Sequence, residues 1–147
     1  MIYIGADHRG YQLKKYIVRY LDKQLHIKAV DLGASEYNAE DDAPDFAKAV
    51  AKKVAKEKDA KGILLCWTGH IMCITANKVK GAYAILGHNM ESAEMGRMHN
   101  NANILCLPTK FLTNEHAVQI VKKFLETEFD GDKRLIRRIN KIKKMEK

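Results

Sequence analysis

GILLCWTGHIMCITANKVK, residues 62–80, contains an apolar run, a cysteine and a glycine turn in that order. The apolar run ends in Cys66, and the Thr68-Gly69 turn leads into a segment from His70 to Lys78 that favours a helix. This order predicts a strand with a cysteine at its carboxyl end. It also predicts free backbone N–H groups at the start of the next helix, where negative charge is stabilised. Since open α/β sheets bind ligands at this edge, we expect the active site here.

Working outward, the same alternation of short apolar runs and helical periodicity continues to both ends of the chain. Strands are expected at residues 2–6, 27–32, 62–66, 83–86 and 104–107. Helical spacing follows each strand, with Pro44 at the start of the second helix and Asn114 expected to cap the fifth. Such alternation implies right-handed βαβ units. The prediction is an α/β fold, a three-layer α/β/α sandwich with a Rossmann-like five-stranded parallel sheet plus a C-terminal helix, in a single domain covering residues 1–147.

Composition limits the class of protein. The chain has 147 residues, of which 46% are hydrophobic and 30% charged, the balance of a globular domain. No apolar stretch approaches the roughly 18 residues of a membrane span, and the N-terminus enters a strand at once, so neither a membrane segment nor a signal peptide is predicted. The three cysteines are odd in number and lack metal-type spacing. They favour a reducing cytoplasm without disulfides.

The formal net charge of +8 suits anionic ligands, either phosphate esters or nucleic acid. Most of the excess lies after Gly131, in the expected last helix, and a solvated basic helix would explain it equally well. The chain lacks the aromatic-interleaved basic surface that binds single strands, and it lacks a recognisable DNA-reading motif. Nucleic-acid binding is therefore the least favoured of the functions considered.

Three loops carry reactive side chains, namely Asp7-His8, Cys66 to Gly69, and His99-Asn100. Each has a simpler explanation: the first pair could cap a helix, the cysteine could pack in the core, and the last pair could be surface polar residues. The predicted topology places all three loops on the same edge of the sheet, which favours a shared site. Near a helix N-terminus, Cys66 is expected to have a depressed pKa and to act as a base.

Six ordered segments of the chain carry a resemblance that covers nearly its whole length. The chain resembles ribose-5-phosphate isomerase B and its relatives, which include the galactose-6-phosphate isomerase subunits. The matching segments are Gly5 to Gly10, Gly62 to Cys66, Thr68-Gly69, Ala76 to Val79, His99 to Asn103, and Arg137 to Ile142.

The resemblance implies a cofactor-free aldose–ketose isomerase that needs no metal, with ribose 5-phosphate and ribulose 5-phosphate as the expected pair. Asp7 and His99, helped by Thr68, would open the sugar ring. Cys66 would move the proton between C1 and C2 through an enediolate. The family builds its site across a dimer interface, so the resemblance also implies a homodimer, or a tetramer, in which the His99 loop reaches in from the neighbouring subunit.

Substrate-binding residues follow from the same resemblance. His8 and Asn100 would hold sugar hydroxyls or phosphate. Arg134 and Arg138, four residues apart and so on one helical face, match the phosphate-binding arginines of the family. Lys110 stands where a phosphate-contacting arginine is usual.

The loop after the cysteine departs from the family pattern Gly-Thr-Gly-Ile-Gly. Here it is Trp67-Thr68-Gly69-His70-Ile71, and we expect Trp67, Gly69, His70 and Ile71 to line the substrate pocket. A positive φ at residue 67 or 71 would cost about 1 kcal/mol or more, whereas an ordinary φ would preserve the N–H donors. The alternative function is the same fold with altered sugar-phosphate specificity or without catalysis, as a phosphate-ligand binder.

Overall fold

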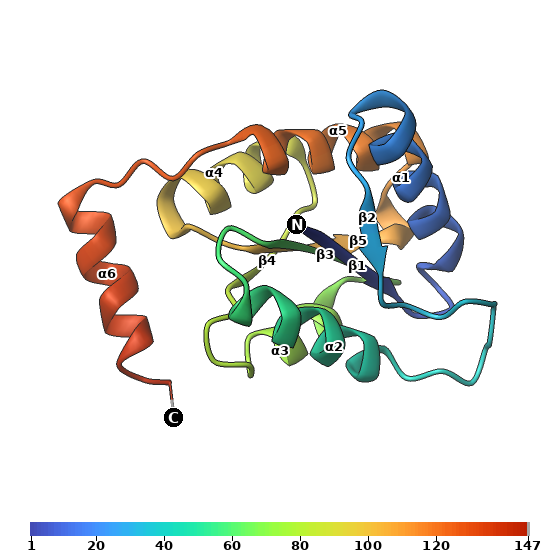
Figure 1. The fold of residues 1–147 in the computed structure, drawn as a ribbon, viewed down its shortest axis with the longest axis horizontal. Coiled ribbons are helices and arrows are strands. Elements are labelled where there is room, and N and C mark those ends of the chain that lie inside the picture. The colour runs from blue at the N-terminus through green and yellow to red at the C-terminus, as the bar shows by residue number, and fades with distance from the viewer. Residues whose placement is uncertain (147) are drawn as a thin grey trace.

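The structure is a computed structural model that describes residues 1–146. Its centre is one five-stranded parallel sheet in the order β2-β1-β3-β5-β4, as the alternation of strands and helices predicts (Figure 1). The strands are β1 (Ile2–Ala6), β2 (Ala29–Asp31), β3 (Lys61–Cys66), β4 (Ala84–Leu86) and β5 (Ile104–Pro108).

Helices cover both faces of this sheet, which confirms the predicted three-layer α/β/α class. One face is covered by α1 (Tyr11–Gln24), α4 (Met90–Asn100) and α5 (Asn114–Glu126), and the other by α2 (Ala43–Lys56) and α3 (His70–Ala76) (Figure 1). The buried strand β3 feeds both cores because its side chains alternate between the faces. Ile63 and Leu65 pack under α1 and α5, whereas Leu64 and Cys66 pack under α2 and α3.

The last helix, α6 (Lys133–Lys143), stands apart from the sheet (Figure 1). It follows Gly131, whose φ of 74° turns the chain away after α5. Of its apolar residues only Ile139 is buried, while Ile136 and Ile142 are exposed. This helix therefore keeps an apolar stripe in solvent beside its basic residues.

Several boundaries differ from the sequence prediction for local reasons. The second strand has three residues rather than six, because His26 takes a positive φ and the amide of Ile27 bonds back to α1. The prediction that Asn114 caps α5 is wrong, since the Thr113 Oγ1 accepts the amide of His116 and Asn114 is the first helical residue. None of the described helices combines the length and the apolar character that crossing a membrane requires.

Candidate active site

Two neighbouring strands place Cys66 and Asp7 together. In the register of β1 and β3, Ala6 pairs with Leu65, and the amide of Asp7 donates to the Leu65 carbonyl at 3.3 Å. The next residues along both strands therefore meet at the carboxyl edge of the sheet. As predicted, the loops that follow β1 and β3 converge, with a carboxylate beside a thiol.

A left-handed glycine shapes the turn that follows the cysteine. Gly69 has a φ of 79° and its N–H donates to the Cys66 Sγ at 3.2 Å. Cys66 itself is only 2% exposed. The turn therefore points backbone donors at the buried sulfur before α3 begins at His70.

Burial raises the pKa of the Cys66 thiol, and this outweighs the other influences on it. Backbone N–H groups of Met72, Gly69 and Thr68 lower the pKa, while the charge of Asp7 raises it further. The expectation of a depressed pKa is therefore wrong in direction. The amides at the helix N-terminus lower the pKa as predicted. Removing the sulfur from water, however, destabilises the thiolate by more than the amide hydrogen bonds stabilise it.

A titration checks this direction. A raised pKa means that Cys66 is mostly a thiol at neutral pH, so its thiolate should appear only above the ordinary cysteine value of about 8.5. We expect the ultraviolet thiolate absorbance that is lost on Cys66→Ser to titrate above that value in the ligand-free protein. A difference titration centred below neutrality would contradict the structure.

The unusual residues of the loop lie at the surface of this edge. Neither Trp67 nor Ile71 has a positive φ, so both are accommodated without backbone strain and the N–H donors are retained. Trp67 is 42% exposed, with the Arg9 guanidinium carbon 4.8 Å and the Lys110 Nζ 5.7 Å from its ring centroid. His70 is likewise exposed at the start of α3. Arg9, which the sequence analysis did not single out, thus joins Lys110 as a second cation beside the indole.

Gly69→Ala is expected to destabilise the fold by about 1–3 kcal/mol and to lower activity. An alanine would be strained at the φ of 79°, and its Cβ would lie too close to a methyl group of Leu86. The cost should appear in urea unfolding. Gly131→Ala is the matched control, because its φ is also positive but a Cβ there meets open space. Equal losses for the two variants would show that packing around residue 69 has no part in the effect.

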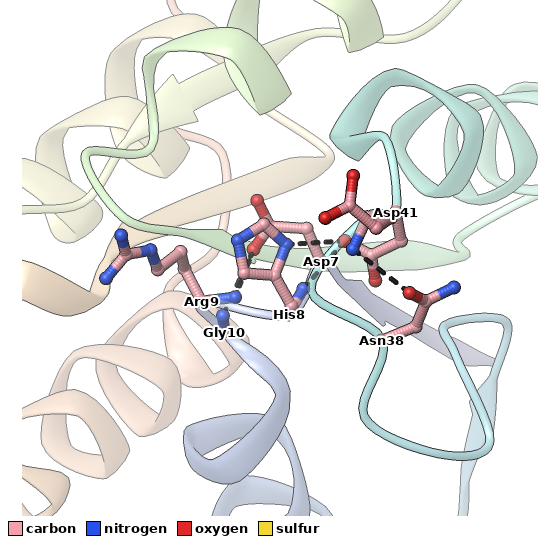
Figure 2. A network of polar contacts seen from close by, with 7 residues as sticks. Asp7, His8, Arg9, Gly10, Asn38 and Asp41 are labelled. Carbon is pink, nitrogen blue, oxygen red and sulfur yellow. Dashed lines mark hydrogen bonds and ion pairs between the residues drawn. The ribbon is translucent and has the colours of Figure 1, made fainter.

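Asp7 and His8 form a polar network with Asp41, a residue that the sequence analysis missed (Figure 2). The Asp7 Oδ1 accepts the amides of Arg9 and Gly10 at 3.0 and 3.1 Å, so Asp7 does organise the turn into α1. Burial nevertheless raises the pKa of Asp7, with the charge of Asp41 acting in the same direction. Among the described residues, Asp7, His8 and Asp41 place one potential metal-ligand atom each within 4.8 Å of one another.

The third loop lies at the opposite edge of the sheet, contrary to the predicted topology. His99 and Asn100 are the last residues of α4, which starts after the carboxyl end of β4 and brings the chain back to the amino end of β5. At that end the Asn103 side chain accepts the amide of Tyr83. There His99 and Asn100 line a cavity of about 410 Å³ with Arg134 and Arg138 of α6. The structure therefore gathers the predicted site residues into two groups.

The carboxyl-edge group (Asp7, His8, Cys66, Trp67, Thr68, Gly69, His70, Ile71 and Lys110) follows β1, β3 and β5. The amino-edge group consists of His99, Asn100, Arg134 and Arg138. A buried thiol beside a carboxylate can move a proton, and paired arginines can hold a phosphate.

The parallel α/β sheet and these two groups of residues agree with the family to which the sequence of the chain points. The chain belongs to the Ribose/Galactose Isomerase family, whose pattern it matches over residues 2–142.

Among its relatives, the probable ribose-5-phosphate isomerase B of Mycoplasma genitalium is 46% identical over 147 residues, covering 99% of this chain and 95% of the relative. The crystal structure of the Mycoplasma genitalium ribose-5-phosphate isomerase B with bound ribulose-5-phosphate has a TM-score of 0.92, covering 97% of this chain and 93% of that one. The Thermotoga maritima ribose 5-phosphate isomerase has the same TM-score of 0.92 at 40% identity, covering 98% and 97% of the two chains.

Proposed function

We propose that this chain is a cofactor-free isomerase that interconverts ribose 5-phosphate and ribulose 5-phosphate. The observation that carries the proposal is the Cys66 thiol at the carboxyl edge, beside Asp7 and under the Gly69 amide. The proposal is supported by membership of the isomerase family and by the 46% identical relative whose structure holds ribulose-5-phosphate.

In the proposed reaction, Asp7 and His99, with the Thr68 hydroxyl, open the ring to the free aldehyde. The Cys66 thiolate then removes the C2 proton, and the electron pair of that bond forms the enediolate. The thiol returns the proton to C1, while O1 gains a proton and O2 loses one to become the ketone. Backbone donors of the 66–69 turn stabilise the oxyanion, the largest single contribution in such reactions, at a few kcal/mol for each donor.

Binding energy comes from the phosphate, far from the reacting carbons. Arg134 and Arg138 would supply paired, charge-assisted hydrogen bonds to a dianion, and Lys110 and Arg9 add positive charge beside the carboxyl edge. His8 and Asn100 would accept or donate to sugar hydroxyls.

We further propose a homodimer in which each active site combines the carboxyl-edge group of one subunit with the amino-edge group of its partner. Within one chain these groups lie at opposite edges of the sheet, too far apart to share one small sugar. The exposed apolar residues Ile136 and Ile142 of α6, next to the arginines, suit a subunit interface. Pairs of such dimers would form the tetramer.

The cytoplasm is the proposed compartment. Cys66, Cys73 and Cys106 are all free thiols, and a catalytic thiolate requires a reducing environment.

The function is tested by giving the purified protein a panel of phosphorylated aldoses with four to six carbons and measuring ketose formation. Turnover of ribose 5-phosphate with the highest kcat/KM is the expected result. Trp67, which stands next to Cys66 where the family pattern has a glycine, favours a second candidate, a relative of this enzyme with a different preferred sugar phosphate. Preference for a six-carbon substrate would support that candidate. Thermal stabilisation by sugar phosphates without any turnover would indicate that the chain binds phosphate ligands but does not catalyse the reaction.

A further inference from the structure

The loop between β2 and α2 delivers Asp41 to a defined place. At its start, the buried Lys14 side chain, 1% exposed, donates to the Ala34 carbonyl at 2.8 Å and pairs with Asp31 at 2.9 Å. At its tip, the Asn38 carbonyl accepts the amide of Asp41 at 3.2 Å. At its end, Ala43 is buried at the start of α2. The position of Asp41 is thus fixed from both sides.

There one oxygen of Asp41 contacts two nitrogen atoms of His8 (Figure 2). Its Oδ1 lies 3.0 Å from the His8 backbone nitrogen and 2.7 Å from the Nδ1 of the ring. The ring is also packed edge-on against Tyr37, with centroids 6.2 Å apart and planes at 88°. Together these contacts fix both the place of His8 and the plane of its imidazole.

The carboxylate of Asp41 is poorly satisfied for a buried group. The side chain is 8% exposed, and its Oδ2 is buried with no hydrogen-bond partner in the part of the chain that the structure describes. Burying an oxygen without a hydrogen-bond partner is costly, so the contacts that the other oxygen, Oδ1, makes with His8 have to offset that cost.

We propose that Asp41 is a positioning residue for the isomerase reaction. By accepting at Nδ1, its carboxylate selects the imidazole tautomer that carries the proton on Nδ1. The Nε2 of His8 is then left as an acceptor for a substrate hydroxyl, at the edge where Asp7 and Cys66 lie. The proposal rests on the proposed function, because it assigns Asp41 a part in that same site.

The test uses Asp41→Ala, with Asp42→Ala as the matched control and Asp41→Asn as the conservative variant. Asp42 is the neighbouring carboxylate, exposed and without a side-chain hydrogen bond at the start of α2. Asn keeps an oxygen that can accept both His8 donors. We expect kcat/KM of Asp41→Ala to fall about 10–100-fold, mainly through kcat. Asp41→Asn should recover much of that loss, and Asp42→Ala should stay within about twofold of wild type.

Nitrogen-15 NMR of the His8 ring, assigned by its disappearance in His8→Asn, gives a readout that a merely structural role would not move. We expect an Nδ1–H tautomer in the wild type and a shift toward Nε2–H in Asp41→Ala. An Nε2–H tautomer in the wild type, or full kcat in a folded Asp41→Ala, would overturn the inference. If Asp41→Ala does not fold, Asp41→Leu, which fills a similar volume without an acceptor oxygen, is judged by the same two readouts. A wild type that turns over no sugar phosphate overturns the proposed function, whereas an active wild type with either contrary result overturns only the role of Asp41.

Discussion

Cys66→Ala is expected to lower kcat for ribose 5-phosphate by about 10²–10⁴-fold while the protein remains folded. The thiol is the group placed to carry the proton between C1 and C2, and alanine removes it while leaving the Gly69 turn in place. The change costs little packing because it removes a single sulfur atom. Initial rates of ketose formation and the thermal unfolding midpoint, measured on the same preparation, separate chemistry from folding.

Cys73→Ala is the matched control for this variant. Cys73 is a partly buried thiol of α3, and its close contact is with the Cys106 sulfur of β5 rather than with Asp7. It should retain wild-type kcat within a few-fold. Full activity in Cys66→Ala, or a larger loss in Cys73→Ala than in Cys66→Ala, would show that Cys66 is not the catalytic base.

Two inactive variants should regain activity when their subunits are exchanged. Cys66→Ala damages the carboxyl-edge group and Arg134→Ala/Arg138→Ala damages the amino-edge group, which lies at the far side of the same chain. A mixed dimer holds one site with both defects and one site with neither. With random exchange at equal amounts, about one quarter of wild-type activity should return, because half of the dimers are mixed and each has one intact site of two.

The measurement is a rate assay after co-refolding or prolonged co-incubation of the two variants. Each variant exchanged with itself serves as the control, and mass spectrometry of a mixture in which one variant is isotope-labelled shows that the subunits have exchanged. If the mixture stays as inactive as its components while exchange is demonstrated, each subunit carries its own complete site and the shared-site proposal fails.

The order of strands and helices could be predicted from the sequence because the three central strands are short apolar runs bounded by polar turns. Ile63 to Cys66 is such a run, and its end at Thr68-Gly69 placed the thiol on the correct edge. The same pattern correctly brought Asp7 beside it. A strand that is buried in a parallel sheet is a near-continuous apolar run, which makes it easy to recognise in the sequence. Because all strands of such a sheet run in the same direction, a residue at the carboxyl end of a strand is known to lie at the carboxyl edge of the sheet.

The remaining features depend on distances that the sequence pattern does not contain. His99 was placed on the wrong edge because an 11-residue helix carries the chain about 16 Å back along the sheet. Whether the pKa of Cys66 is raised or lowered depends on how completely α2 and α3 cover the sulfur. Asp41 reaches His8 from 33 residues away, through a loop shaped by Lys14 and Asn38. No short motif announces that contact.

The chain contains one tryptophan, and it stands next to the proposed base. The indole of Trp67 lies against the Arg9 and Lys110 cations, which a sugar phosphate arriving at this edge would attract. The tryptophan fluorescence of the protein therefore comes from a single ring, and we expect its surroundings to change when the site fills. Occupancy can be followed by that emission without any label, even in variants that perform no chemistry.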